Sequence, residues 1–249
     1  MKKLLAALAL AGLSSAVFAA EIHVAVAANF TGPAKELAPL YEKATGDKVV
    51  LSFGSTGAFY AQIKNGAPFD VMLAADAKTP AKMVNEGLGV KGTEFTYAVG
   101  KLVLWSAKDG FVKDESVLKS ADLKKLAVAD AKLAPCGEAA EQTLKSLGLY
   151  EQLKPKFVVG NNIGKTFQFV KSENAQAGFV AMSQCTRDGK FTSGSGWVVP
   201  QKYYKQIRQD AVILTASKEK DAAARFTKYL KESPEAAKIR ASFGYDTAK

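Results

Sequence analysis

The feature that most constrains the fold is a repeated alternation of short apolar segments with longer segments of helical periodicity. The apolar segments are rich in β-branched residues and cover residues 22–28, 48–53, 71–75, 101–105, 126–129, 156–159, 177–181 and 210–214. Segments with helical spacing of apolar residues cover 33–44, 56–65, 138–147, 165–171, 217–231 and 234–242. This alternation predicts βαβ units, a mostly parallel sheet and an α/β fold.

Length and composition limit the remaining choices. With 249 residues, 48% of them hydrophobic and 23% charged, the chain is typical of a globular protein with one large or two small α/β domains. It contains one histidine and two cysteines. These are too few for a Cys/His zinc cluster, and any Ser-His-Asp triad must use His23. We therefore expect no bound metal cation.

The first 19 residues have the pattern of a secretory signal peptide. Lys2 and Lys3 precede the apolar run Leu4–Leu13, and small residues end the segment at Ala19. The apolar run is too short to span a bilayer, and no stop-transfer pattern follows, which argues against the alternative of an N-terminal membrane anchor. The sequence predicts an exported protein.

The chain is basic, with a formal net charge of +10. A basic chain suggests nucleic-acid binding, but the lysines are spread along helical segments such as 218–238 and are not gathered among aromatic residues. A solvated lysine-rich surface explains this pattern, so we expect no nucleic-acid partner. The charge would attract anionic solutes over long distances.

Small or polar residues stand at several junctions where a predicted strand ends and a helix begins. These junctions are residues 28–31, 54–57, 134–137 and 161–164. Each junction alone is explained by the ordinary preference of Asn, Ser and Thr for helix N-caps. Parallel strands bring such junctions to one edge of a sheet, where unpaired N–H groups and helix dipoles favour an anion.

One segment looks like a nucleotide-binding loop but has the wrong spacing. Residues 160–166 place three residues between Gly160 and Gly164, whereas a Walker A motif needs four. An exported protein also has no cytoplasmic ATP to hydrolyse. We therefore predict no nucleotide cofactor.

Several motifs, taken together, resemble those of periplasmic molybdate-binding proteins that feed ABC transporters. They run in order along almost the whole mature chain: residues 26–31, 52–57, 62–70, 73–76, 127–130, 134–137, 179–181 and 243–245. The resemblance implies a two-lobed type II periplasmic-binding-protein fold, with the ligand between the lobes and two hinge crossovers. By that layout the crossovers lie near Gly100–Lys101 and Arg208–Gln209. Lobe one is then 20–100 plus 209–249, and lobe two is 101–208.

The resemblance also implies a set of oxyanion-binding residues. The side chains and N–H groups of Asn29 and Ser55 would bind the anion from lobe one, beside Ala28 and Thr56. In lobe two, Cys136 and Ile163 would contribute backbone N–H groups. Ala181 stands where some family members have a ligand tyrosine, so one phenolic donor is missing.

The function that the resemblance implies is transport without catalysis. The ligand would be molybdate, with tungstate also accepted, and no cofactor is implied. The partner would be the membrane permease of a molybdate ABC transporter, and the protein would act as a periplasmic monomer.

Two alternatives remain at this stage. The first is a receptor for another tetrahedral oxyanion such as sulfate, which the sequence separates poorly from molybdate. The second is an exported serine hydrolase with Ser55 as nucleophile and His23 as base. His23 begins the first predicted strand and Ser55 follows the end of the second, which argues against this pair.

The last prediction concerns a possible disulfide between the two cysteines. Cys136 and Cys185 are the only cysteines of a chain that we expect to be exported, and an oxidising compartment favours a disulfide between them. The alternative is two separate buried thiols.

Overall fold

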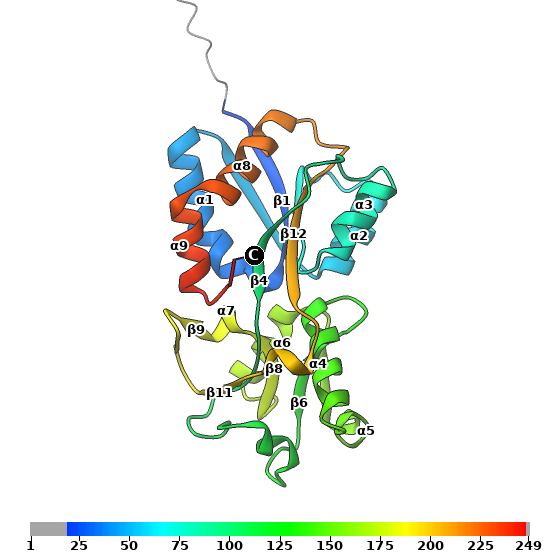
Figure 1. The fold of residues 1–249 in the computed structure, drawn as a ribbon, viewed down its shortest axis with the longest axis vertical. Helices are drawn as coiled ribbons and strands as arrows, with labels where there is room; N and C mark the ends of the chain where they lie inside the picture. Colours follow the sequence, from blue (N-terminus) through cyan, green and yellow to red (C-terminus); the bar gives the residue numbers. More distant parts are fainter. Residues whose placement is uncertain (1–18, 248–249) are drawn as a thin grey trace, which may run out of the picture.

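Two sheets with helices on their faces form two lobes that lie end to end (Figure 1). This computed structural model describes residues 19–247. The predicted signal peptide, residues 1–19, lies outside the described residues apart from Ala19. The α/β class and the two-lobed architecture are confirmed.

The first sheet has five strands in the order β2-β1-β3-β12-β4. Their bounds are β1 Glu21–Ala27, β2 Lys48–Gly54, β3 Val71–Leu73, β4 Phe95–Gly100 and β12 Ile207–Ile213. Strand β1 pairs in parallel with β2 and β3, whereas β12 pairs antiparallel with β3 and β4. The sheet is therefore mixed, and only its β1–β3 half is parallel.

The second sheet has five strands in the order β11-β5-β8-β6-β7. Their bounds are β5 Leu102–Ser106, β6 Leu126–Ala129, β7 Phe157–Gly160, β8 Ala177–Ala181 and β11 Ser195–Val198. Strand β6 is parallel to β7 and β8, and β5 is antiparallel to β8 and β11. A separate antiparallel pair is formed by β9 Thr186–Arg187 and β10 Lys190–Phe191.

Helices cover both faces of each sheet (Figure 1). The α-helices are α1 Thr31–Thr45, α2 Thr56–Lys64, α3 Lys78–Asn85, α4 Pro135–Ser146, α5 Tyr150–Leu153, α6 Ile163–Lys171, α7 Met182–Cys185, α8 Lys220–Glu232 and α9 Pro234–Ser242. Short 3₁₀ helices are η1 Ala28–Phe30, η2 Glu115–Lys119, η3 Lys154–Lys156 and η4 Gln201–Tyr203. Within residues 19–247, no helix combines the length and apolar character needed to cross a membrane.

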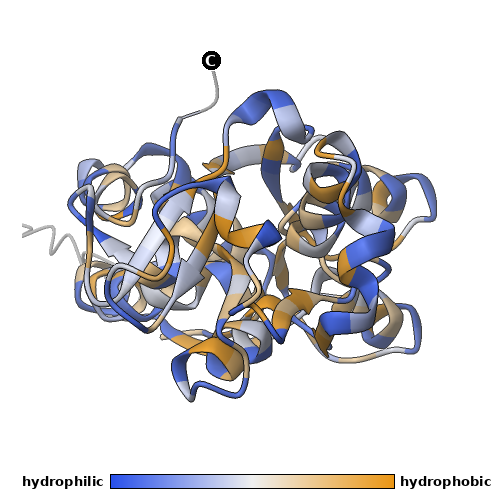
Figure 2. Ribbon diagram, turned by 90° about the horizontal axis from the view of Figure 1, so that it is seen from below, coloured by the Kyte–Doolittle hydropathy of each residue, from blue (hydrophilic) through white to orange (hydrophobic). Residues whose placement is uncertain are grey.

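Successive side chains of each strand point to opposite faces of the sheet, so each lobe has two apolar layers, one on each face. In β1, Val24 and Val26 pack beneath α1 and α8, whereas Ala25 faces the cluster beneath α2 and α3. In β5, Leu104 and Trp105 likewise belong to the clusters on opposite faces of the second sheet. Figure 2 shows the result, with apolar segments inside and polar segments outside.

The chain passes between the sheets along β4 and β12, which run side by side through the middle of the molecule (Figure 1). Strand β4 ends at Gly100 in the first sheet, and β5 begins at Leu102 in the second. Ile207, the first residue of β12, pairs with Gly100, and its side chain belongs to the core of the second lobe. A register shift between Gln209 and Asp210 interrupts the pairing of β12 with β4.

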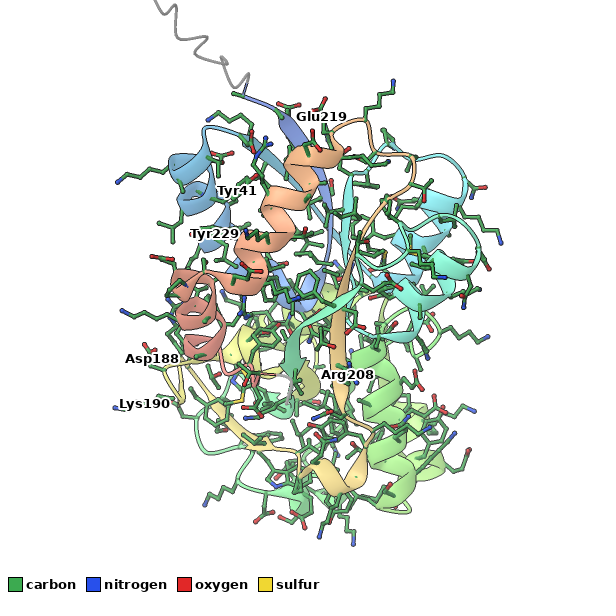
Figure 3. All side chains as sticks on the ribbon, turned by 45° about the horizontal axis from the view of Figure 1, so that its top comes forward. Tyr41, Asp188, Lys190, Arg208, Glu219 and Tyr229 are labelled. Atoms are coloured by element: carbon green, nitrogen blue, oxygen red, sulfur yellow. The ribbon has the colours of Figure 1, made fainter. Side chains whose placement is uncertain are left out.

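A buried carboxylate joins α1, α8 and the start of β2 in the first lobe. Asp47 is fully buried and accepts hydrogen bonds from Tyr41 Oη at 2.7 Å and Arg225 Nη2 at 2.9 Å. Tyr41 also packs edge-on against Tyr229, beside it in Figure 3. Burial alone raises the pKa of Asp47, but the hydrogen bonds from Arg225 and Tyr41 outweigh it, and the pKa lies below its usual value.

Arg225→Met should therefore destabilise the protein in a pH-dependent way. Loss of the charge-assisted hydrogen bonds is expected to lower the unfolding free energy by about 1.5–3 kcal/mol at pH 7. Because the folded-state pKa of Asp47 is depressed, the stabilisation is present above the unfolded pKa of about 3.9 and is lost as the pH falls through the folded value. Denaturant unfolding at pH 7 and pH 3 measures this, with Lys228→Met on the same helix as the control. Equal stability of the two variants at pH 7 would contradict the assignment.

Candidate functional site

Four strand ends converge on one small cavity between the two sheets. The strands β1 and β2 of the first sheet, and β6 and β7 of the second, each lead into a helical turn at this gap. The cavity is narrow, with a volume of about 10 Å³, the space that one water molecule needs. Its lining residues are Ala27, Ala28, Asn29, Gly54, Ser55, Thr56, Ala75, Ala134, Pro135, Cys136 and Ile163. The structure thus brings together all six predicted site residues.

The first lobe contributes the start of α2. Ser55 is the N-cap, and its Oγ accepts a hydrogen bond from Ala58 N at 3.3 Å, which leaves the hydroxyl hydrogen available. The Thr56 hydroxyl accepts from Ala75 N at 2.9 Å and so holds another cavity residue in place. The N–H groups of Ser55 and Thr56 have no acceptor within the helix because they precede its first complete turn.

The second lobe contributes the starts of α4 and α6. Pro135 occupies the first turn of α4 and has no N–H, so the amide of Cys136 is the first donor of that helix. Asn162 caps α6 by accepting from Lys165 N at 2.9 Å. The amide of Ile163 lies one residue after this cap and has no intrahelical acceptor. Gln184 Nε2 donates to Ile163 O at 3.1 Å and fixes this turn against α7.

The cavity is neutral as well as buried. Asn29, Ser55, Thr56, Cys136 and Ile163 are each at most 4% exposed. Burial raises the pKa of the Cys136 thiol to about 12, so the sulfur carries no negative charge at neutral pH. Helix N-termini therefore supply the electrostatic character of the cavity, each equivalent to about half a positive charge. Such a site favours a small anion over a cation.

A larger groove lies beside this cavity and shares Ala75 and Pro135 with it. Its lining is charged, and some of these side chains are held by other residues. Lys78 Nζ lies 2.7 Å from Glu138 Oε2, and Arg208, labelled in Figure 3 between the lobes, donates to Thr96 Oγ1 at 2.7 Å. The residues at the helix starts line the smaller cavity, and of these only Pro135 also lines the groove.

The structure also places three residues at the site that the sequence did not single out. Asn29 Nδ2 donates to Gln209 Oε1 at 2.8 Å and to Tyr245 Oη at 3.0 Å. Ser183 Oγ, from the second lobe, donates to the Asn29 carbonyl at 2.7 Å. Both amide hydrogens of Asn29 are therefore engaged inside the protein, and the expected Asn29 side-chain donor does not face the cavity in this structure.

Tyr245 supplies the phenol nearest to the site. Ala181 stands at the position where some family members have a ligand tyrosine. It lines an adjoining cavity together with Tyr245 and Ser183. Gly244 has φ +82°, and a Cβ there would lie 3.0 Å from Met182 Sδ, so glycine allows the turn that brings Tyr245 inward. The 243–245 motif was the available signal, but its spacing gave no indication that the tyrosine reaches Asn29.

Direct contacts join the two lobes around the cavity. Gly57 N donates to Leu133 O at 3.0 Å, and a Cβ on Gly57 would lie 3.1 Å from Leu133 Cα. On the other side of the molecule, the Arg187 guanidinium binds the Glu36 carboxylate through two hydrogen bonds of 2.8 and 2.9 Å. Exposed ion pairs of this kind contribute at most about 1 kcal/mol each, so this contact holds the two lobes together only weakly.

The predicted disulfide is wrong. Cys136 and Cys185 are both free, buried thiols. Cys136 begins α4 and packs in the core beneath that helix, whereas Cys185 ends α7 and packs with Val103 and Trp105 on the opposite face of the second sheet. The sheet separates the two sulfurs, a relation that sequence separation alone does not reveal.

The hydrolase alternative finds no support in the geometry. His23 is in register with Val50, and Ala27 is in register with Gly54, the residue before Ser55. At about 3.3 Å per residue, His23 lies roughly 13 Å back along the sheet from the cavity edge. Its Nε2 approaches Glu21 Oε1 at 3.4 Å, and Ser55 has no imidazole beside it.

Comparisons with known proteins agree with this geometry. A family model described as bacterial extracellular solute-binding protein matches residues 22–246. The chain is 54% identical to the molybdate-binding protein ModA of Azotobacter vinelandii, over 98% of this chain and 97% of that protein. It is 49% identical to the molybdate-binding protein ModA of Rhodobacter capsulatus, over 95% and 92%. The chain belongs to the molybdate-binding family of bacterial extracellular solute-binding proteins.

A solved structure of the same family supports the fold as well. The periplasmic molybdate-binding protein of Azotobacter vinelandii superposes with a TM-score of 0.89 and 40% sequence identity, covering 92% of this chain and all of that one. The family resemblance expected from the sequence motifs is confirmed.

Proposed function

We propose that this protein captures molybdate in the cavity between its lobes and delivers it to the permease of an ABC transporter. The observation that carries the proposal is the convergence of helix-start amides from both lobes on one buried, neutral cavity. Its relatives at 54% and 49% identity are named molybdate-binding proteins, which favours molybdate over sulfate. Tungstate, a tetrahedral dianion of the same charge, is a second ligand of the proposed site.

Binding requires no formal positive charge in the cavity. The Ser55 hydroxyl and the N–H groups near Ala28, Asn29 and Thr56 donate from the first lobe. The amides of Cys136 and Ile163 donate from the second lobe. A dianion held in this way is stabilised by several hydrogen bonds and by helix dipoles. Because the donors come from both lobes, opening the lobes separates the two sets of donors and releases the ligand.

The remaining parts of the proposal concern the whole chain. Residues 1–19 direct export to the periplasm and are then removed. Residues 20–100 with 209–249 form lobe one, residues 101–208 form lobe two, and the crossovers at 100–101 and 208–209 act as the hinge. The protein works as a monomer, needs no cofactor and catalyses no reaction.

Ser55→Ala tests the site directly. Removing the hydroxyl eliminates a charge-assisted hydrogen bond worth about 1.5–3 kcal/mol, so molybdate affinity should fall roughly 10- to 150-fold. Ser233→Ala is a matched control because Ser233 caps α9 in the same manner, accepting from Ala236 N at 3.0 Å, far from the cavity. Each variant should lose about 1 kcal/mol of stability from its cap. Calorimetric titration showing equal molybdate affinity for the two variants would contradict the assignment.

Gly57→Ala tests the requirement for closure. The added Cβ would press on Leu133 of the opposite lobe, and overpacking of this kind typically costs about 1–3 kcal/mol. The cost falls on the closed form, so molybdate affinity should drop roughly 5- to 150-fold. Thermal unfolding without ligand should be unchanged or slightly higher because alanine favours the helix. Unchanged affinity would show that the two lobes need not approach this closely.

A further inference from the structure

The buried polar network around Asn29 contains one unsatisfied atom. Asn29 is 2% exposed, and its Oδ1 has no hydrogen-bond partner among the described residues. Buried polar atoms are almost always paired, so an orphaned side-chain oxygen beside a ligand cavity needs an explanation. The oxygen and nitrogen of an amide have nearly the same shape, and their assignment follows from the surrounding hydrogen bonds.

The surrounding hydroxyls favour a rotation of the side-chain amides of Gln209 and Asn29 that exchanges the oxygen and nitrogen of each. Tyr97 Oη lies 3.0 Å from Ala74 O and 3.1 Å from Gln209 Oε1. Burial raises the pKa of Tyr97, so the phenol keeps its single hydrogen. The Ala74 carbonyl is the nearer partner and can only accept, whereas the Gln209 amide can present either its oxygen or its nitrogen, so we assign the hydrogen to the carbonyl. Tyr97 Oη then faces Gln209 as an acceptor, which calls for the nitrogen of Gln209 at that position.

Rotating the Gln209 amide has a consequence for Asn29. Gln209 would then donate to Asn29, so the Asn29 oxygen would turn into the network and its nitrogen would take the orphaned position. Tyr245 Oη lies 3.0 Å from the Asn29 amide nitrogen and donates to the Asn29 carbonyl at 2.8 Å; after the rotation, its single hydrogen would move from that carbonyl to the inward oxygen. The Asn29 carbonyl would keep its bond from Ser183 Oγ at 2.7 Å. In this arrangement the outward Asn29 N–H groups have no acceptor among the described residues, so they need one in the cavity.

We propose that Gln209 is a positioning residue of the oxyanion site, which turns the Asn29 amide so that its N–H groups face the bound anion. This inference rests on the proposed function. Gln209 lies in the crossover strand β12 at the register shift, and irregularities of this kind re-aim side chains. A Cβ on Gly100 would lie 2.5 Å from Gln209 Nε2, so the glycine of the other crossover strand leaves room for this amide. The anion contact is thereby linked to the two strands that join the lobes.

A double-mutant cycle tests the link. Gln209→Met keeps the length of the side chain and removes its hydrogen bonds, and molybdate affinity should fall about three- to tenfold in calorimetric titration. In an Asn29→Ala background, the same Gln209→Met change should alter affinity less than twofold, because no amide remains to be oriented. If the affinity loss of the double variant equals the product of the losses of Gln209→Met and Asn29→Ala, Gln209 acts independently of Asn29, through hinge packing, and the proposal is wrong.

A second variant and a spectroscopic readout keep the test independent of the folding of Gln209→Met. Tyr97→Phe removes only the hydroxyl that orients Gln209, and it should weaken molybdate binding in the wild-type background but not in Asn29→Ala. In protein labelled with ¹⁵N-asparagine, molybdate should shift the side-chain amide resonances of Asn29. Unchanged Asn29 resonances at saturating molybdate would overturn this proposal alone, whereas absence of molybdate binding to the wild-type chain would overturn the proposed function.

Discussion

Backbone N–H groups at helix starts are the constraint on which the site depends. Such groups have no intrahelical acceptor, and burying them is costly unless another acceptor is supplied. Ser55 and Thr56 stand at one helix start of the first lobe, and Cys136 and Ile163 stand at two of the second. The parallel strands within each sheet bring these starts to the same edge. Two such edges facing each other leave a neutral cavity that a small dianion can satisfy.

The crossover strands connect this local arrangement to both lobes, as the proposed closing motion requires. Strands β4 and β12 carry Tyr97 and Gln209, which contact each other, and Gln209 also contacts Asn29 on the cavity wall. Ser183, from the second lobe, binds the carbonyl of the same asparagine. The ligand site, the crossover strands and both lobes therefore share one hydrogen-bond network. Weak exposed ion pairs such as Arg187–Glu36 assist closure without locking it.

Much of the fold could be predicted because it depends on local patterns. The ranges 126–129, 177–181 and 234–242 match strands β6 and β8 and helix α9. The direction of the strands could not be predicted. The segments of β5 and β12 were expected as strands, but their antiparallel pairing, and the strand β11 beside β5, depend on long-range contacts. The six cavity residues came from motifs, whereas Gln209 and Ser183 lie far from Asn29 in sequence and lack a motif. The disulfide between Cys136 and Cys185 was predicted from the oxidising environment of an exported protein. That environment does not determine on which side of the sheet Cys185 packs.

The position of the bound ion tests the central claim most directly. A crystal of the protein grown with tungstate allows the tungsten atom to be located by anomalous scattering at its L-edge. We expect one strong peak in the cavity, with oxygens within hydrogen-bond distance of Ser55 Oγ and of the amides of Cys136 and Ile163. A peak in the charged groove beside Lys78 and Arg208, or no peak in either place, would contradict it.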